Sequence, residues 1–423
     1  MGSYPYDRVM AEHSVVDASI NVTPNAEGLV DLAAMGEPFE RDPYPVYAAL
    51  RERGPVHRVR TPEGALAWLV VGHEAARTAL ADPRLAKEWK HASADARVNA
   101  VSSGTHMLIA DPPDHTRLRK LVAREFTMRR IADLEPLVRA TTDELLDAML
   151  AGGDGRADLV EALAFPLPIT VISELMGVPQ LDREVFRRWS DEVLGTAPDE
   201  EKAVSAEKLT AYLLDLIDSA RHRDDDDLLS ALVRTSDEDG DRLSAEELLG
   251  MAWLLLIAGY ETTVGLISNG ALALLRHPDQ LAALRADPGL LPGAVEEMLR
   301  YDGPVETSTY RFTTEPVEIG GTVIPGDGQL VLPVLADADR DPRRFAEPDT
   351  FDVRRAPRGH LAFGHGIHFC LGAPLARMEA RIAFERLLAR VPTLELDTTP
   401  AGLRWRDGLL LRGLRGLPVR FAA

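Results

Sequence analysis

The sequence predicts a mainly α-helical fold with small β-sheets, arranged as one large domain around a long central helix. Much of the chain repeats apolar residues at three- and four-residue spacing, as in RIADLEPLVRATTDELLDAML, a pattern typical of amphipathic helices. Short β-type runs, such as those in PVEIGGTVIPGDGQLVLPV, are parted by Gly-Gly and Pro-Gly turns. No internal repeat or Ser/Gly-rich linker interrupts the 423 residues, so we expect a single folded domain.

The domain is expected to span residues 31–423, after an N-terminal tail of residues 1–30 that is partly expression-derived or poorly ordered. Met10 is a candidate natural start, and the first residues lack the apolar stretch of a secretory signal. A single cysteine excludes an internal disulfide, which fits a cytoplasmic protein. The formal net charge of −20 argues against binding to nucleic acid or to an anionic membrane surface.

The long helix is centred on an apolar stretch, residues 251–275, that resembles a membrane span in length. Glu261 lies near its middle, and a carboxylate at that depth is costly in lipid, so we expect a buried core helix instead. Ser244 and Glu247 form a capping-box pattern at its start. The helix is predicted to end at Arg276, just before a His-Pro pair, which gives a length of roughly 48 Å.

The segment FGHGIHFCLG, residues 363–372, contains the only cysteine, Cys370. A lone buried cysteine is most often an inert small hydrophobe. Here three glycines allow backbone amides to approach the sulfur, and the positive end of the following helix points toward it. These features predict a stabilised thiolate. A thiolate can be a nucleophile, with His365 or His368 as its base, or an axial ligand to iron.

The pattern FGxGxHxCxG specifies five positions besides the cysteine, and it resembles the haem-thiolate loop of the cytochrome P450 family. The resemblance implies a cytochrome P450-type domain with the long helix over the haem. It implies haem b as the cofactor, with Cys370 as the axial ligand of the iron. Phe363 and Gly372 would lie against the cofactor at the two ends of the loop.

The segment AGYETT in the middle of the long helix resembles the family's oxygen-activation motif. Small Ala258 and Gly259 would leave room for dioxygen, and Glu261 with Thr262 would form the acid–alcohol pair that delivers protons. Alone, the motif could equally be a buried polar pair whose threonine hydroxyl bonds the preceding turn. Tyr260 stands where bacterial relatives commonly have histidine, and we expect it to point away from the iron with little consequence.

The EMLR segment places Glu297 three residues before Arg300, and 73 residues before the cysteine. An ion pair at this spacing occurs in many helices and alone indicates nothing. In this position it resembles a structural pair of the cytochrome P450 family, with Arg355 of FDVRR as the third member. We expect these three residues to hold the fold around the haem rather than to touch the substrate.

The segment DPPDHTRLRKLVAREF, residues 111–126, predicts a helix with two basic faces. At about 100° per residue, His115 and Arg119 share one face. Arg117, Lys120 and Arg124 fall on a nearly opposite face. Ordinary solvated charge explains most basic helices, so the pattern by itself assigns no function.

The resemblance assigns a role to each face. The donors to the haem propionates would be His115, Arg119, Arg311 and His368. The opposite face, Arg117, Lys120 and Arg124, would dock an acidic ferredoxin, extended by Arg129 and Arg130. The negative charge of the chain would then be concentrated elsewhere, for instance at 224–227 and 237–241.

The implied activity is that of a haem-thiolate monooxygenase. Electrons from NAD(P)H would arrive through ferredoxin reductase and ferredoxin, and one oxygen atom of O₂ would enter the substrate by hydroxylation or epoxidation. The resemblance is strongest to actinobacterial members that oxidise macrolides, and LRKLVAREFTMRR and LPITVISELMGVP carry it. It implies a macrolide or polyketide of antibiotic biosynthesis, with a non-macrolide natural product as the alternative. Expected substrate contacts are Val101, Met107, Ile109, Leu254, Val305, Thr309, Leu409 and Leu410.

Two other classes of protein remain as alternatives. A cysteine-nucleophile hydrolase would use His365 or His368, but it leaves the motifs at Glu261, Glu297 and Arg119 unexplained. A haem-binding carrier or sensor without turnover has no need of an acid–alcohol pair. That pair also disfavours a peroxide-driven cytochrome P450.

Overall fold

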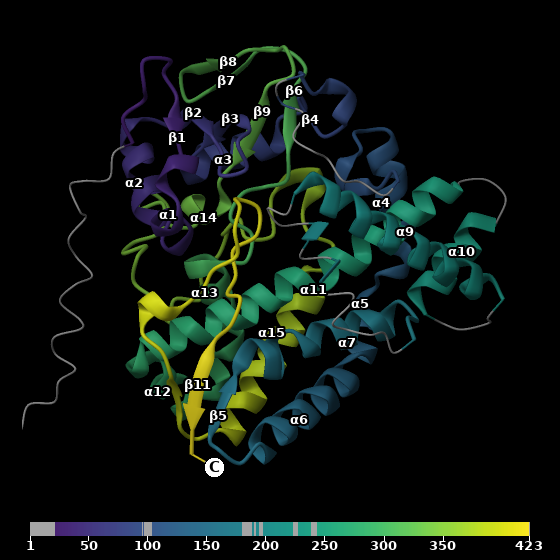
Figure 1. The fold of residues 1–423 in the computed structure, drawn as a ribbon, viewed down its shortest axis with the longest axis vertical. Coiled ribbons are helices and arrows are strands. Elements are labelled where there is room, and N and C mark those ends of the chain that lie inside the picture. The colour runs from purple at the N-terminus through teal and green to yellow at the C-terminus, as the bar shows by residue number, and fades with distance from the viewer. Residues whose placement is uncertain are drawn as a thin grey trace, which may run out of the picture.

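The computed structural model describes residues 22–94, 96, 104–179, 188–189, 192–193, 198–222, 227–237 and 243–422, and it confirms a mainly helical fold with small sheets. The helices are α1 (Glu37–Arg41), α2 (Tyr44–Arg53), α3 (His73–Ala81), α4 (Asp114–Glu125), α5 (Met128–Asp133), α6 (Glu135–Ala151), α7 (Pro166–Leu175), α9 (Asp199–Arg221), α10 (Leu228–Asp237), α11 (Ala245–Arg276), α12 (Pro278–Ala286), α13 (Leu291–Asp302), α14 (Leu335–Ala338) and α15 (Ala373–Arg390). Figure 1 shows the sheet region with α1, α2 and α3 on one side of the molecule and the large helical body on the other.

The strands form three small sheets. A six-stranded sheet has the order β1 (Val30–Asp31), β2 (Val56–Arg60), β3 (Leu66–Val70), β9 (Leu330–Pro333), β6 (Arg311–Thr313) and β4 (Leu85–Ala86). The second sheet contains β10 (Leu394–Leu396), β11 (Pro418–Phe421) and β5 (Arg156–Asp158), and the third pairs β7 (Val317–Ile319) with β8 (Thr322–Ile324). In the large sheet β2 and β3 form an antiparallel hairpin, and β3 pairs in parallel with β9.

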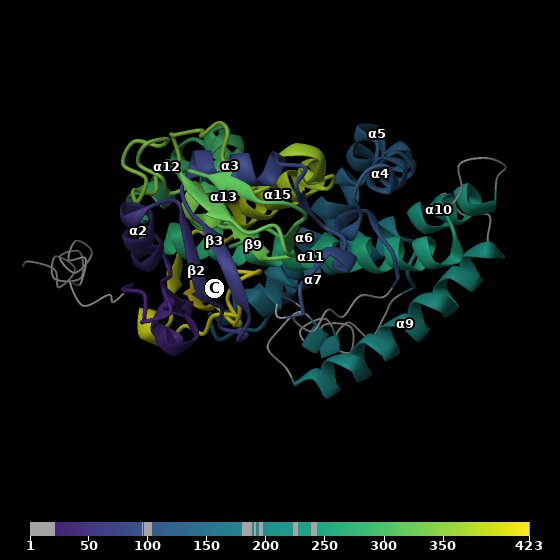
Figure 2. The same cartoon turned by 90° about the horizontal axis from the view of Figure 1, so that it is seen from above.

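The central helix α11 has the predicted start and end. The Ser244 hydroxyl accepts from the Glu247 amide at 3.1 Å, and the Glu247 carboxylate accepts from the Ser244 amide at 2.8 Å. Figures 1 and 2 show α11 running through the helical body, where it packs against α7, α13 and α15. Its most apolar 18-residue stretch is long and apolar enough to cross a membrane, but 83% of that stretch is buried inside the protein. Burial of this kind is that of a core helix, as predicted.

The backbone of the segment that begins at Gly104 packs directly against the backbone of α11. A Cβ atom on Gly250 would lie 2.4 Å from the carbonyl oxygen of Thr105, which is closer than atoms approach. Glycine at this position therefore allows the 104–108 segment to lie directly on the helix. The Met107 amide then donates to the sulfur of Met251 at 3.4 Å.

The described part of the predicted N-terminal tail packs on the domain. Val22, Leu29 and Val30 are buried, and Val30 pairs in parallel with Val59 of β2. The folded unit therefore includes residues before the predicted boundary at residue 31. Of the two acidic segments, 224–226 and 238–241 lie outside the described residues, and the Asp227 carboxylate accepts from the Ser230 amide at the start of α10.

Candidate functional site

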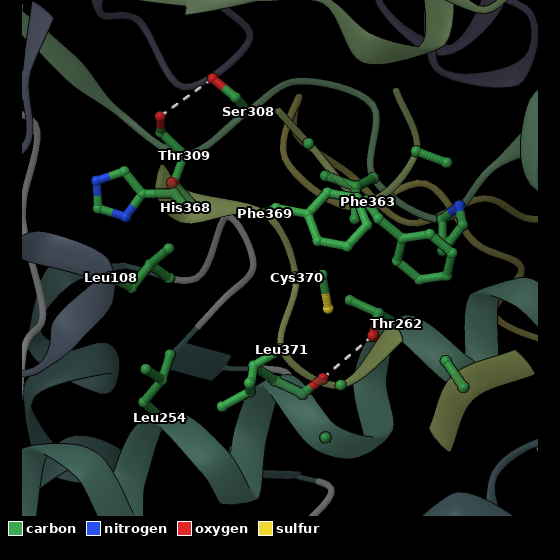
Figure 3. A pocket seen from close by; sticks show the side chains of 18 of the residues that line it. Leu108, Leu254, Thr262, Ser308, Thr309, Phe363, His368, Phe369, Cys370 and Leu371 are labelled. Carbon is green, nitrogen blue, oxygen red and sulfur yellow. Dashed lines mark hydrogen bonds between the residues drawn. The ribbon is translucent and has the colours of Figure 1, made fainter. Parts of the chain in front are cut away.

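A cavity lies where α11, the 363–372 loop, α4 and the segment leading into β6 meet. It encloses about 1430 Å³, its open mouth included. Its walls are mainly apolar, with side chains such as Leu254, Leu255, Leu266 and Val305. Figure 3 shows the Cys370 sulfur inside this space, with Thr262 of α11 on one side and Phe363 and Phe369 of the loop on another. The geometry is that of a chamber for a bulky apolar molecule above a reactive sulfur.

The cysteine loop is closed by its own backbone. The Cys370 amide donates to the Phe363 carbonyl at 2.9 Å, and the Gly364 amide donates to the Leu361 carbonyl at 2.7 Å. Gly364 and Gly366 have φ values of +74° and +77°, which side chains other than glycine rarely adopt. The turn therefore requires these two glycines, and it directs Cys370 into the cavity rather than toward the outer surface.

The electrostatics of the Cys370 sulfur combine two opposing effects. Burial raises the pKa of the Cys370 thiol, and the amides of Gly372 and Ala373 together with Arg119 and Arg377 lower it again without fully offsetting burial. The amides that reach the sulfur thus come from the start of α15, not from Gly364 or Gly366. Burial therefore opposes the thiolate that the loop predicts, whereas the amides and the two arginines favour it. A cation bound to the sulfur would favour the thiolate further.

The four expected propionate donors, His115, Arg119, Arg311 and His368, all line the cavity. His115 is 2% exposed and Arg311 4% exposed, yet among the described residues both ring nitrogens of His115 and Nε of Arg311 have no hydrogen-bond partner. The rings of His115 and His368 lie 4.3 Å apart. Buried donors are almost always paired. These side chains therefore fit an anionic group with several acceptor oxygens, and the two carboxylates of haem b meet that need.

Lys87 belongs to the same end of the cavity and was missed by the sequence reasoning. Burial lowers the pKa of His368 to about 2, and Lys87 is the next cause, ahead of His115 and Arg311. Nothing in the local sequence around Lys87 indicates burial, because its partners lie more than 200 residues away.

The acid and the alcohol of α11 face different surroundings. Thr262 lines the cavity, and its hydroxyl donates to the Ala258 carbonyl at 3.1 Å. Glu261 does not line the cavity: it is 4% exposed, accepts from the Tyr260 hydroxyl at 2.5 Å and forms an ion pair with Arg406. Consecutive residues on a helix are separated by about 100°, so the side chains of Glu261 and Thr262 point in different directions.

Tyr260 contacts the acid of the motif and does not line the cavity. Its ring is buried against Phe165, with centroids 6.0 Å apart, and it lies away from the cavity as anticipated. Its hydroxyl is also a direct partner of the Glu261 carboxylate, a contact that the sequence pattern did not reveal. The neighbouring Gly259 also has a second role: a Cβ there would lie 2.6 Å from Ile172 of α7, so helix packing requires the glycine.

The three structural residues are brought together as expected. The Arg300 guanidinium donates to both oxygens of Glu297, at 2.7 and 2.8 Å, and Nε of Arg355 donates to Glu297 at 3.1 Å. Arg300 also donates to the carbonyls of Asp339, Pro348 and Thr350. The side chains of Glu297 and Arg300 are fully buried, and neither lines the cavity.

Half of the expected substrate contacts line the cavity, namely Met107, Leu254, Val305 and Thr309. Ile109, Leu409 and Leu410 do not, and Val101 lies outside the described residues. The carbonyls of Leu409 and Leu410 accept from the amides of Thr307 and Glu306, so this turn packs against the 305–309 segment. Lining residues that sequence reasoning missed include Leu108, Ile172, Leu255, Leu266, Leu299 and Ser308.

The expected docking face of α4 is only partly available. Lys120 and Arg124 are exposed. Arg117 is not, because it forms an ion pair with Glu247 at the start of α11, and 28% of its side chain is exposed. Helix phase could not reveal this partner, which lies 130 residues away in the sequence.

The Glu297→Gln variant should be destabilised by about 3–5 kcal/mol, because it leaves the buried Arg300 charge without its partner. The measurement is the free energy of unfolding in urea. Glu395→Gln is the matched control, since Glu395 pairs with Arg420 at the surface, where both side chains are more than half exposed. An exposed pair contributes about 0–1 kcal/mol. Equal losses in the two variants would contradict the assigned structural role.

The comparisons with known proteins agree with this geometry. A profile of the family described as "Cytochrome P450" matches residues 197–399. The chain is 60% identical over 393 residues to "Cytochrome P450 monooxygenase PikC" of Streptomyces venezuelae, covering 93% of this chain and 94% of that protein. It is 47% identical to "6-deoxyerythronolide B hydroxylase" of Saccharopolyspora erythraea, covering 90% and 96%.

Among solved structures, the "tirandamycin C-bound P450 monooxygenase TamI" superposes with a TM-score of 0.86 at 46% identity, covering 93% of this chain and all of that one. The identity to full-length relatives exceeds what a shared fold alone would require, and the only cysteine stands in the loop that faces the cavity. The chain belongs to the cytochrome P450 family and is a monooxygenase that binds haem b through a cysteine thiolate.

Proposed function

We propose that this monooxygenase inserts one oxygen atom into a macrolide or related polyketide of antibiotic biosynthesis, by hydroxylation or epoxidation. The large cavity with mainly apolar walls supports this, with Ser308 and Thr309 as polar points on one wall. The names of the relatives support it too, since one hydroxylates 6-deoxyerythronolide B and another was solved with tirandamycin C. A bulky apolar natural product without a lactone ring is the alternative, because the same walls would suit it.

Binding separates the two substrate classes. In the proposed class, 6-deoxyerythronolide B should displace the iron-bound water and shift the haem from low to high spin, and NADPH-driven turnover should add one oxygen atom to its mass. A long-chain fatty acid serves as the apolar ligand without a lactone. A spin shift with the fatty acid and none with a panel of polyketide lactones would favour the alternative.

The haem-binding residues can be assigned one by one. We assign Cys370 as the iron ligand, because it is the only cysteine and faces the cavity. His115, Arg119, Arg311 and His368 are assigned to the carboxylates, with Phe363 and Gly372 beside the ligand loop. When bound, haem with a thiolate ligand supplies the reduction and cleavage of dioxygen. The residues of this chain position the group, exclude water and move protons.

Proton movement is assigned to Thr262 and Glu261. The Thr262 hydroxyl stands on the cavity wall, where it can hold an oxygen atom or a water molecule by hydrogen bonding. Glu261 lies behind it, tied to Tyr260 and Arg406. A carboxylate held in this way can pass a proton toward the cavity only when its ion pair with Arg406 opens. Tyr260 and Arg406 are therefore positioning residues for the acid.

Redox coupling is assigned to an acidic ferredoxin that docks over α4, within a cytoplasmic electron-transfer system. Arg119 donates to the Phe369 carbonyl at 2.6 Å, so α4 lies directly against the cysteine loop. Lys120 and Arg124 are exposed on the same helix. Ile367 of the loop and Met128 are exposed apolar side chains, 52% and 66% respectively. Apolar and basic surface close to the ligand loop suits an acidic electron donor.

The Cys370→Ser variant should lose the thiolate-type absorption band of the CO complex and all monooxygenation, because no second cysteine is present to replace the ligand. The measurement is the CO difference spectrum of the reduced protein. Persistence of the thiolate band would rule out Cys370 as the ligand and with it the assigned site.

The Thr262→Ala variant should still consume NADPH but release more peroxide, with the fraction of electrons found in product falling by roughly tenfold to a hundredfold. Product and peroxide are measured against NADPH consumed. Ser268→Ala is the matched control, because Ser268 also bonds the preceding turn of α11 but does not line the cavity. Equal coupling in both variants would show that protons reach the site by another route.

The Lys120→Glu/Arg124→Glu variant should be reduced more slowly by an acidic ferredoxin at low salt, with its CO spectrum and substrate binding unchanged. Opposite charges steer encounter, and salt screens them. The rate for the unmodified protein should therefore fall as salt rises, and that for the variant should change less. The control is Arg53→Glu/Arg58→Glu, which reverses two exposed arginines of α2 and β2. Equal reduction rates in the two double variants would place the docking site elsewhere.

A further inference from the structure

Lys87 is buried, with 3% of its surface exposed, although lysine is rarely buried without a charged partner. It follows β4 directly in the chain. Its backbone amide donates to both carboxylate oxygens of Asp111, at 2.9 Å each, which fixes the main chain beside the start of α4. Its side chain therefore points from a fixed position into the interior.

The ammonium group of Lys87 is held by two neutral acceptors. Nζ donates to the Thr309 hydroxyl at 2.5 Å and to the Tyr310 carbonyl at 2.6 Å. Thr309 lines the cavity, whereas Lys87 does not. An ammonium has three N–H donors, so two bonds leave one donor. Among the described residues no carboxylate accepts from this group.

Lys87 has a positive neighbour, Arg311, and a negative neighbour, Asp111. Burial lowers its pKa well below the usual value, Arg311 lowers it further, and Asp111 opposes them. Lys87 in turn contributes, after burial, to a pKa of about 4 for His106. With the unpartnered donors of His115 and Arg311 close by, this end of the cavity has more donors and positive charge than the chain itself satisfies.

We propose that Lys87 is a positioning residue that joins the two functions of the cavity: it fixes the Thr309–Tyr310 wall and, with His115 and Arg311, it stabilises a bound anion. This inference rests on the proposed function, under which the anion is a carboxylate of haem b. An anion at this end stabilises the ammonium, and the ammonium then holds Thr309 in one orientation against the cavity. Haem binding and the shape of the substrate side are thereby linked through one side chain.

The test compares Lys87→Met with Lys90→Met. Lys90 is the matched control, because its side chain is 66% exposed and pairs only with Glu88. Lys87→Met should transfer haem to apomyoglobin roughly tenfold faster, since a charge-assisted hydrogen bond is lost. Its haem reduction potential should become more negative, because a nearby positive charge favours the reduced form. Lys90→Met should match the unmodified protein in both measurements.

A double-mutant cycle tests the link to Thr309. Thr309→Val should also speed haem transfer, and the Lys87→Met/Thr309→Val variant should be no faster than Lys87→Met alone, because both changes remove one interaction. Additive effects would contradict the link. Unchanged haem transfer and potential in Lys87→Met would overturn the proposal as a whole.

Two further controls keep the outcome clear. If Lys87→Met does not fold, Lys87→Gln, which keeps a polar end, takes its place. If neither folds, unchanged haem transfer in Thr309→Val alone contradicts the proposal. All variants keep Cys370, so a thiolate-type CO spectrum in each of them leaves the proposed function intact whatever the result for Lys87. A missing thiolate band in the unmodified protein would instead contradict the proposed function.

Discussion

The position of the cysteine loop depends on one carboxylate, Glu296 of α13. It accepts from Nε and Nη2 of Arg377 at 2.6 and 2.8 Å, and it contacts Nε2 of His360 at 2.9 Å. His360 precedes the loop and Arg377 follows it on α15, so this carboxylate ties together both ends of the segment that contains Cys370. Burial alone would raise the pKa of Glu296, but Arg377 and His360 outweigh it and lower the pKa to about 2. The Glu296 carboxylate is therefore ionised throughout the physiological pH range. The Arg377 guanidinium also lies 4.4 Å from the centre of the Phe363 ring, which adds a contact at the start of the loop.

Glu296 and the Glu297–Arg300 pair are on the same helix, α13, which helps to explain how the loop is held relative to α11. Glu297 is the next residue after Glu296, and its partners Arg300 and Arg355 reach the segment that leads to the loop. α13 also packs directly against α11 and α15. Two adjacent carboxylates on a single turn thus hold the loop and the segment that leads to it, on a helix that packs against α11. The cavity between them has two electrostatic needs: a cation at the sulfur and anions for His115 and Arg311. A haem group meets both needs at once, because its iron is cationic and its two carboxylates are anionic.

Features that could be predicted from the sequence are mostly local. The capping box of Ser244 and Glu247, the end of α11 at Arg276 and the positive φ values of the loop glycines follow from residues within a few positions of one another. The resemblance extended this to Cys370, His115 and Arg311, because a family motif carries long-range information in a short pattern. Contacts between residues far apart in the sequence and outside any motif could not be predicted. The helical periodicity predicted that Arg117 points away from the haem, but it did not reveal Glu247 as its partner. Leu409 looked like an apolar cavity residue and instead belongs to the core beside the large sheet.

The same limit explains the most consequential difference, which concerns Glu261. The motif supplied an acid beside an alcohol as a pair that delivers protons, and it did not indicate which way each side chain points. A helix separates neighbours by about 100°, so only one of the two can point directly into the cavity, and in this chain it is Thr262. Glu261 is then surrounded by protein, where an unpaired carboxylate would be costly. Tyr260 and Arg406 remove that cost, and Arg406 comes from a segment 145 residues away. The partners that make the buried acid stable are also the ones that restrain it. Under the proposed assignment, proton delivery would depend on how readily the Arg406–Glu261 pair opens, and the sequence around Thr262 does not reveal that pair.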